Sequence, residues 1–391
     1  MTLIGLAYNQ KPELNELPTE LPEAARHQGG ELSRPDEEPP SRIFGLTVAE
    51  LATRDEFAEW DSPATIAAVE AALSKLGRVV RIEATEDFPE RVRAIRPDIV
   101  FNIAEGFHGV NRESHVPAIC EFFGIPYSGS DPFTLTLCLD KARTKETLYF
   151  HGIPTPKFAV VENLADLDGR TAGLTLPLFV KPLHEGSSKG ITDGNLCRDR
   201  GQLLSQTKFL LESYHQPVLV EEYLPGNEFT CGVLGNGDEA TVLPIVGMNF
   251  DALPEGALPI YSFDAKFVWD RPERPLEIFQ CPAKISRDLQ QAIERVVLDA
   301  YRVLGCRDWA RIDVRLDAAG NPNILEVNPL PGILPDPAEN SCLPKAARAA
   351  GIGYDDLIQS CLRFAAARQG VGLHESTAPT VAPGEPLLAA G

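Results

Sequence analysis

The chain has 391 residues and a formal net charge of −20, because 36 lysine and arginine residues face 56 aspartate and glutamate residues. A general nucleic-acid-binding protein needs a basic field to meet phosphates, so this balance argues against one. The hydrophobic share of 43% and the charged share of 24% are typical of a globular protein, and the length predicts two or three domains.

The amino-terminal segment and the cysteines predict the compartment. No apolar run approaches the roughly 18 residues needed to cross a bilayer, and residues 1–7 are too short for a signal segment. We therefore expect no membrane partner.

The eight cysteines are scattered, without a CxxC pair or a histidine at metal-ligand spacing. This pattern predicts a reducing, cytoplasmic location, with unpaired and mostly buried thiols and no thiolate-bound zinc.

Residues 1–135 are expected to form an N-terminal parallel α/β domain. A short apolar strand at residues 2–8 precedes a segment at 11–42 that carries six prolines and eight carboxylates. This composition cannot bury enough apolar surface to fold alone, so we expect an acidic, proline-rich insertion. Ser62 and Pro63 then start a helix, with Ser62 as its N-cap.

Strands and helices alternate over the rest of this domain. Strands are predicted at residues 79–82 and 98–103, and a helix at 113–123. Short turns between such elements are typical of a parallel sheet, whose ligands lie beyond the carboxyl ends of the strands. The candidate residues at that edge are Asn102, Glu105, Arg112 and Glu113.

Two further subdomains and a tail complete the predicted organisation. Residues 136–235 hold two continuous apolar strands, joined by a Gly/Ser loop and a helix. Residues 236–370 hold apolar strands, a helix, a β-hairpin and a terminal helix. Residues 371–391 are low in bulky side chains and predict a disordered tail.

The segment from Trp309 to Asn328 is the most informative part of the sequence. In its first strand apolar residues alternate with Arg311 and Asp313, so one face is apolar and the other charged. In its second strand Glu326 and Asn328 share one face. Pairing the two strands as a hairpin can bring Asp313, Glu326 and Asn328 together.

These three side chains suit a hard cation, because they offer two carboxylates and an amide oxygen. Magnesium held by one or two carboxylates takes the rest of its shell from water and substrate phosphates. The sequence thus predicts a Mg²⁺ site, with Mn²⁺ as an alternative metal. A solvated polar hairpin face is the competing interpretation, and the apolar flanks of both strands argue against it.

A glycine- and serine-rich loop follows a predicted strand. Lys181 ends the strand, and residues 186–190 read Gly-Ser-Ser-Lys-Gly. Backbone N–H groups and hydroxyls in such a loop can wrap a phosphate chain. The loop matches neither the P-loop nor the Rossmann pattern, and a plain flexible turn explains it equally well.

Residues 217–230 can serve an adenosine. The strand backbone can contact the adenine edge, and Glu228 can accept hydrogen bonds from ribose hydroxyls. An apolar strand that ends in a charged turn is the alternative.

Seven segments between residues 98 and 362 carry a family resemblance. They are Leu139-Asp-Lys-Ala-Arg-Thr-Lys, Val180-Lys-Pro-Leu-His-Glu-Gly-Ser-Ser-Lys-Gly, Val220-Glu-Glu-Tyr-Leu-Pro-Gly-Asn-Glu-Phe-Thr, Asp264-Ala-Lys-Phe, Cys281-Pro-Ala, Leu304-Gly-Cys-Arg-Asp-Trp-Ala-Arg-Ile-Asp-Val and Leu325-Glu-Val-Asn-Pro. In this order they resemble the ATP-grasp superfamily and, within it, the D-alanine–D-alanine ligases.

The resemblance implies an ATP-grasp fold of class α/β (α+β), preceded by the N-terminal parallel α/β domain. It implies an ATP-dependent carboxylate–amine ligase that forms a peptide or amide bond through an acyl phosphate and releases ADP. The implied cofactors are ATP and Mg²⁺, and the implied partners are small amino-acid or carboxylate substrates and a second copy in a homodimer. Peptidoglycan biosynthesis is the pathway that this family suggests.

The resemblance also assigns roles to residues. The implied phosphate-binding residues are Lys141, Lys181, Lys266, Ser187 and Ser188. The implied adenine and ribose contacts are Glu221, Glu222, Tyr223, Leu224 and Glu228. The implied magnesium ligands are again Asp313, Glu326 and Asn328, and the implied catalytic residues are Arg311, Lys266 and Ser187. The resemblance implies that Arg311 steadies the tetrahedral intermediate.

The departures from the family lie on the substrate side. The insertion at 11–42 replaces a short loop that bears a substrate-recognising glutamate, and Glu59 and Asp61 are candidates for its role. Capping of the helix after Ser62 is the alternative for both, and it has at least as much support. Phe267 stands where these ligases commonly carry a tyrosine. The candidate substrate residues are Glu59, Glu105, Arg112, Glu113 and Ser341.

Three alternatives to a D-alanine ligase follow from these departures. The chain can ligate other amino acids or small carboxylates, stop at the acyl phosphate as a phosphotransferase, or bind ATP as a regulatory protein without ligating. Arg311 has no evident use in nucleotide binding alone, so its presence argues against the last of these.

Overall fold

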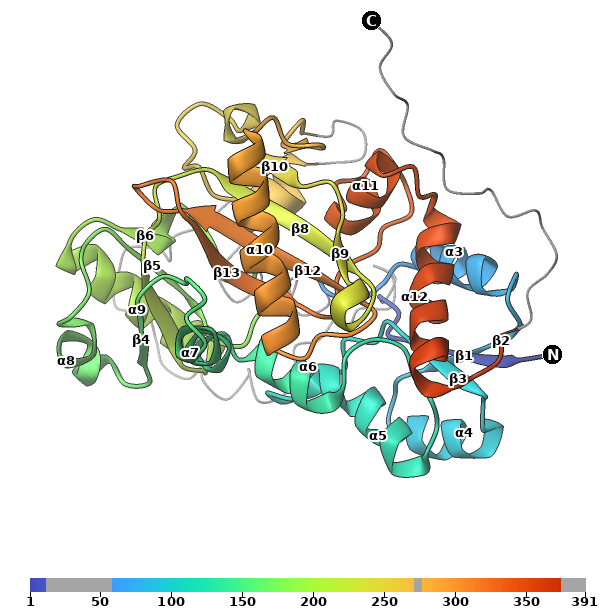
Figure 1. Ribbon diagram of the computed structural model, residues 1–391. Helices are drawn as coiled ribbons and strands as arrows, with labels where there is room; N and C mark the ends of the chain where they lie inside the picture. The colour runs from blue at the N-terminus through green and yellow to red at the C-terminus, as the bar shows by residue number, and fades with distance from the viewer. Residues whose placement is uncertain (12–57, 271–275, 374–391) are drawn as a thin grey trace, which may run out of the picture.

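The computed structural model describes residues 1–11, 58–270 and 276–373. Three sheets follow one another along the described chain, with helices packed on them (Figure 1). The predicted insertion after Lys11 and the tail after Leu373 lie outside the described residues, as does the side chain of Phe267.

The first sheet is parallel, with the order β2-β1-β3, as the sequence predicts. Its strands and helices are β1 (Leu3–Tyr8), α3 (Pro63–Leu73), β2 (Arg78–Glu83), α4 (Phe88–Ile95), β3 (Ile99–Asn102) and α5 (His115–Phe123). The predicted N-cap of α3 is confirmed, because Ser62 Oγ accepts a hydrogen bond from the Thr65 N–H at 3.1 Å. The helix predicted from residue 113 begins two residues later, after a 3₁₀ turn at Arg112–Ser114.

The second sheet is antiparallel, with the order β4-β7-β5-β6. Its strands are β4 (Phe158–Val161), β5 (Leu178–Pro182), β6 (Leu196–Cys197) and β7 (Val218–Glu222). The helices of this part are α6 (Pro132–Leu139), α7 (Lys141–Phe150), α8 (Leu167–Thr171) and α9 (Arg200–Tyr214). The Gly/Ser loop joins β5 to β6, so it lies at one end of this sheet.

The third sheet holds the predicted hairpin and has the order β11-β10-β8-β12-β13, with β9 paired to β8. Its strands are β8 (Glu228–Leu234), β9 (Thr241–Val242), β10 (Val246–Met248), β11 (Phe279–Gln280), β12 (Trp309–Leu316) and β13 (Pro322–Asn328). Helix α10 (Arg287–Val303) lies across it (Figure 1). The chain changes sheets between β7 and β8, ahead of the predicted boundary at residue 236.

The carboxyl-terminal helices tie the third part to the first. They are α11 (Cys342–Ala349) and α12 (Tyr354–Gln369). Helix α12 packs beside α3 (Figure 1), and Leu73 and Leu357 share one buried core with the first sheet. Gln359 Nε2 also donates to the Ala72 carbonyl at 3.2 Å. The N-terminal domain is thereby held against the third sheet.

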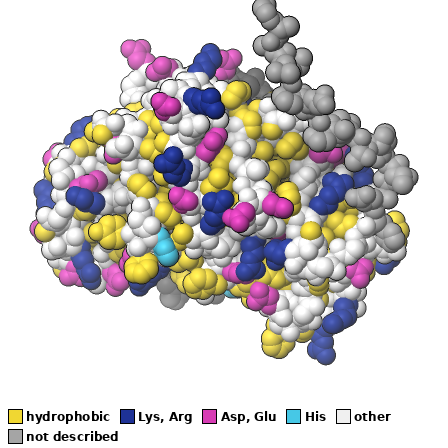
Figure 2. Space-filling view, viewed as in Figure 1, with side chains coloured by type: hydrophobic (Ala, Val, Ile, Leu, Met, Phe, Trp, Pro, Cys, Tyr) yellow, Lys and Arg dark blue, Asp and Glu magenta, His cyan; other side chains and the backbone are white. Residues whose placement is uncertain are grey.

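Charged side chains of both signs are mixed on the described surface, as the composition implies. Figure 2 shows basic and acidic side chains interspersed over the face that carries α10. Within the described ranges, no helix is both long and apolar enough to cross a membrane. All eight cysteines are unpaired and six of them are buried, as predicted.

Candidate active site

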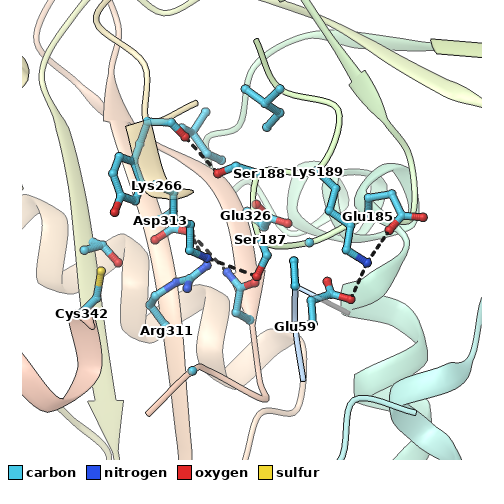
Figure 3. Close-up of a pocket in the computed structure, with 18 of the residues that line it drawn as sticks. Glu59, Glu185, Ser187, Ser188, Lys189, Lys266, Arg311, Asp313, Glu326 and Cys342 are labelled. Atoms are coloured by element: carbon cyan, nitrogen blue, oxygen red, sulfur yellow. Dashed lines mark hydrogen bonds and ion pairs between the residues drawn. The ribbon is translucent and has the colours of Figure 1, made fainter. Parts of the chain in front are cut away.

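A cavity of about 680 Å³ is lined by residues of all three parts of the chain. The close-up in Figure 3 shows side chains of the Gly/Ser loop, the β12–β13 hairpin and the N-terminal domain that point toward one another. The predicted site residues that line it are Glu59, Asp61, Glu105, Glu113, Lys141, Lys181, Ser187, Ser188, Glu221, Glu222, Tyr223, Leu224, Glu228, Lys266, Arg311, Asp313, Glu326, Asn328 and Ser341. Arg112 is not among the lining residues, but it pairs with the lining residue Glu59 at 3.1 Å.

The hairpin brings its three oxygen-bearing side chains together. Asp313 lies opposite Glu326 in the β12–β13 register, and Arg311 lies opposite Asn328. Asp313 Oδ2 accepts hydrogen bonds from Arg311 Nη2 at 3.1 Å and from Asn328 Nδ2 at 3.3 Å. Two carboxylates and an amide on one face fit the donor set that Mg²⁺ takes from proteins when phosphates complete its shell.

Glu326 is kept ionised by cations. Burial opposes its charge, but Lys141 and Lys181 outweigh this effect and lower its pKa to about 2. Lys141 Nζ lies 2.8 Å from Glu326 Oε1. The carboxylate is thus available as a metal ligand at neutral pH.

A buried lysine pair shares one carboxylate in the second sheet. Lys181 Nζ lies 2.8 Å from Glu221 Oε1, and Lys145 Nζ lies 2.9 Å from Glu221 Oε2. The side chain of Glu221 is therefore bonded within the protein, which leaves only its backbone for the implied adenine contact. Lys145 is a residue that sequence reasoning missed. Its signal is its place one helical turn after Lys141 in the same motif.

Changing Glu221 to glutamine should destabilise the fold, because the two buried lysines then lose the one carboxylate that both contact. We expect Glu221→Gln to lower the free energy of unfolding by about 3 kcal/mol. Lys145→Met should lower the free energy of unfolding by less, because Glu221 keeps Lys181 as its partner. Urea unfolding followed by circular dichroism measures both, and a Glu221→Gln variant as stable as the wild type would contradict this account.

The Gly/Ser loop is held in an unusual conformation. Ser187 and Ser188 have φ angles of 49° and 59°, a region that residues other than glycine rarely adopt. Contacts maintain it, since Ser188 Oγ donates to the Tyr261 carbonyl at 2.9 Å and Asn195 Nδ2 donates to the Gly190 carbonyl at 2.7 Å. Such outliers cluster at ligand-binding sites. These contacts hold the Gly/Ser loop in a defined conformation, as a phosphate-binding loop requires.

Lys266 and Arg311 add positive charge at the loop. Lys266 Nζ contacts Ser187 Oγ at 3.2 Å. Burial and the nearby Arg311 lower the pKa of Lys266 to about 8. Burial also disfavours the charge of Arg311, but Asp313 outweighs it and raises the pKa of the guanidinium. An anion placed between these cations would stabilise the charge on both.

Glu59 belongs to a charge network rather than to a helix cap. It pairs with Arg112 Nη2 at 3.1 Å and with Lys189 Nζ at 2.9 Å. Lys189 lies between Glu59 and Glu185 in Figure 3, and it reaches Glu185 at 3.1 Å. The suggested helix-capping role of Glu59 is wrong, since Ser62 caps α3. Lys189 stands in the Gly/Ser loop motif, but the sequence pattern alone assigns it no role.

Three further carboxylates, those of Asp61, Glu105 and Glu113, line the same end of the cavity. The described residues supply none of them with a side-chain hydrogen bond or ion pair. Burial raises the pKa of Asp61 to about 7, and burial also raises that of Glu113 to about 7 although Arg112 opposes the shift. Burial and the charge of Glu113 raise the pKa of Glu105 as well. Burial therefore makes the protonated form more favourable than usual for all three of these carboxyl groups.

The shift at Asp61 makes stability depend on pH. The folded state keeps this proton up to a pH of about 7, whereas the unfolded chain releases it near 3.8, so stability is lost as the pH rises through this window. The slope for one group is at most about 1.4 kcal/mol per pH unit. Asp61→Asn should remove this part of the pH dependence, so the difference in unfolding free energy between wild type and variant should change between pH 4 and 8. Parallel curves would contradict the assignment.

Ser341 has its hydroxyl engaged inside the protein. Its Oγ donates to the Gly332 carbonyl and accepts from the Leu334 N–H, both at 3.2 Å. The side chain thus shapes the loop after β13. The next residue, Cys342, lines the cavity beside Arg311, as Figure 3 shows.

A family model described as "D-ala D-ala ligase C-terminus" matches residues 148–363, which is more than half of the chain. The chain belongs to the D-alanine–D-alanine ligase family. The matched residues span the second and third sheets, including the Gly/Ser loop and the hairpin.

Individual relatives agree with this membership. The chain is 37% identical over 267 residues to an uncharacterised protein, y4sG, of Sinorhizobium fredii, covering 68% of this chain and 74% of that protein. It is 35% identical over 268 residues to a D-alanine–D-alanine ligase of Cupriavidus taiwanensis, covering 68% and 76%. A crystal structure of a D-alanine–D-alanine ligase from Bacillus anthracis complexed with ATP has the same fold, with a TM-score of 0.62 and 22% identity over 95% of this chain and 99% of that one.

These comparisons confirm the predicted family, fold class and class of enzyme. The protein is an ATP-dependent ligase of the D-alanine–D-alanine ligase type, which forms a carbon–nitrogen bond. ATP and Mg²⁺ are the cofactors of this family, and amino acids are its small-molecule substrates.

Proposed function

We propose that the protein uses Mg²⁺ and ATP to join the carboxylate of one amino acid to the amine of another, with D-alanine as the first candidate on both sides. The observation that carries the proposal is the convergence of the Gly/Ser loop, the buried lysines, the hairpin carboxylates and Arg311 on one cavity. With D-alanine on both sides, the product is a dipeptide for peptidoglycan biosynthesis.

The nucleotide lies between the second and third sheets in this proposal. The Leu224 N–H has no acceptor among the described residues and lines the cavity after β7, so it can donate to adenine. Glu228 stands at the start of β8, where it can accept hydrogen bonds from the ribose. Lys141, Lys181 and Lys266 then face the phosphates, and Ser187 and Ser188 cover them.

The first chemical step needs neutralisation of negative charge. A carboxylate oxygen of the first substrate attacks the γ-phosphorus, the bond to the bridging oxygen breaks, and ADP leaves. The buried lysines stabilise the charge that develops on the phosphoryl oxygens, because charge is weakly screened in a buried site. A magnesium ion held by Asp313, Glu326 and Asn328 supplies further charge stabilisation when bound.

The second step forms the amide. The neutral amine attacks the acyl carbon, Arg311 stabilises the oxyanion, and inorganic phosphate leaves. The amine must first lose a proton, and Glu113 is the proposed acceptor, since its pKa of about 7 suits proton transfer at neutral pH. Glu113 also lies near the hairpin, close enough to interact with the charge of Glu326.

A substrate panel tests the proposal. Purified protein with Mg²⁺ and ATP is given D-alanine, its L-enantiomer and other amino acids singly and in pairs, and the nucleotide products are separated. ADP and phosphate should appear with D-alanine, together with the dipeptide. Release of AMP and pyrophosphate would refute the acyl-phosphate route, and ADP release with other amino acids only would refute D-alanine.

We also propose a homodimer in the cytoplasm. Exposed aromatic side chains on α5, α6 and α7 provide apolar surface for a second copy: Phe122, Phe133, Tyr149 and Phe150. Unpaired cysteines suit a reducing compartment. Light scattering coupled to gel filtration tests the dimer, and a monomer at micromolar concentration would contradict it.

A further inference from the structure

Arg315 is a buried cation at the nucleotide end of the cavity that the proposed reaction leaves without a role. It lies on β12 with Arg311 and Asp313, each two residues apart on the cavity-lining face. Two residues along a strand advance about 7 Å, so the three side chains form a row. It runs from Arg311 at the proposed acyl centre, through the proposed metal ligand Asp313, to Arg315 at the ribose end. Arg315 is only 4% exposed.

The contacts of Arg315 hold it against Glu228. Its Nη1 donates to Glu228 Oε2 at 2.7 Å, and its Nη2 donates to Tyr223 Oη at 2.7 Å and to the Pro259 carbonyl at 3.0 Å. The guanidinium carbon also lies 4.8 Å from the Tyr223 ring centroid. These contacts come from separate segments, so the guanidinium has one well-defined position.

This arrangement leaves one of the two oxygens of the Glu228 carboxylate available to a ligand. Arg315 engages Oε2 only, and the described residues offer no hydrogen-bond donor to Oε1. Glu228 lines the cavity, so Oε1 can accept from a hydroxyl of a bound nucleotide. Burial and the charge of Asp313 raise the pKa of Glu228, whereas Arg315 opposes this shift, so the arginine also favours the ionised acceptor form.

We propose that Arg315 is a positioning residue that orients Glu228 toward the ribose hydroxyls and so makes the site selective for ribonucleotides over deoxyribonucleotides. The inference rests on the proposed nucleotide site. A carboxylate held by a charged hydrogen bond loses little conformational entropy when it accepts a hydrogen bond from a ribose hydroxyl. When a deoxynucleotide lacks that hydroxyl, the carboxylate oxygen is left without its donor.

Calorimetric titration of the whole protein with ADP, 2′-deoxy-ADP and 3′-deoxy-ADP in the presence of Mg²⁺ tests the inference. Wild-type protein should bind ADP about tenfold more tightly than at least one deoxy analogue. In Arg315→Met the ratio should fall to about one, mainly through weaker ADP binding. Arg315→Met combined with Glu228→Gln should be no less selective than Glu228→Gln alone, because both changes remove the same contact.

The control variants distinguish failure of this inference from failure of the proposed nucleotide site. Arg287→Met, an exposed arginine at the start of α10, should keep the wild-type ratio. If Arg315→Met does not fold, Arg315→Lys carries the same measurement, since lysine keeps the charge but cannot reach three acceptors in a planar fork. Unchanged selectivity in a folded Arg315 variant, or no selectivity in the wild type, overturns the inference. Failure of the wild type to bind ADP at all would instead refute the proposed nucleotide site.

Discussion

Asp313→Asn and Glu326→Gln should each lower kcat by about 10³-fold while the protein stays folded. A bound magnesium ion contributes several kcal/mol to stabilising charge in the transition state, and each substitution removes one anionic ligand. The two carboxylates lie opposite each other in the β12–β13 register, so the loss of either leaves the other unable to hold the ion in the same place.

The measurement is ADP release at saturating ATP over a range of Mg²⁺ concentrations. Both variants should need more Mg²⁺ for half-maximal activity, and excess Mg²⁺ should not restore the wild-type rate. Asp299→Asn on the exposed face of α10 is the matched control and should behave as the wild type. Wild-type turnover in Asp313→Asn with an unchanged Mg²⁺ requirement would show that the hairpin does not bind the metal.

Arg311→Met should lower kcat for dipeptide formation by about 10² to 10³-fold, with little change in the KM for ATP. This is the typical loss when one oxyanion-stabilising donor is removed. Arg311→Lys should restore only part of the rate, because an ammonium lacks the planar fork of a guanidinium. The control is Arg295→Met, an exposed arginine on α10.

Hydroxylamine trapping shows which step Arg311 serves. If the arginine acts on the tetrahedral intermediate, Arg311→Met should still form the acyl phosphate, which hydroxylamine captures as a hydroxamate. Asp313→Asn should form neither hydroxamate nor dipeptide. Equal loss of hydroxamate and dipeptide in Arg311→Met would place the arginine at phosphoryl transfer instead.

The local pattern of the sequence was sufficient for the hairpin and the order of the elements. Side chains alternate across a strand with a period of two, so the charged face of β12 and the shared face of Glu326 and Asn328 follow from spacing alone. The alternation of strands and helices before residue 124 likewise indicated the parallel sheet, and the ordered motifs indicated the family.

Contacts between distant segments could not be predicted in this way. Glu59 meets Lys189 across 130 residues of sequence, and Arg315 meets Glu228 across 87. Glu221 belongs to the implied adenine hinge, and the motif does not show that its side chain holds Lys145 and Lys181 in the interior. A motif shows that a charged residue is present, but its partner depends on which elements pack against it.

The sequence by itself therefore determined the fold class, the family, and the donor set of the hairpin, because these depend on short-range periodicity and on the order of motifs. The tertiary structure alone decided which charges are paired and which face the cavity. Burial makes an unpaired charge costly, so the packing of three sheets around one cavity pairs buried charges such as Glu221 and Arg315 with partners inside the protein.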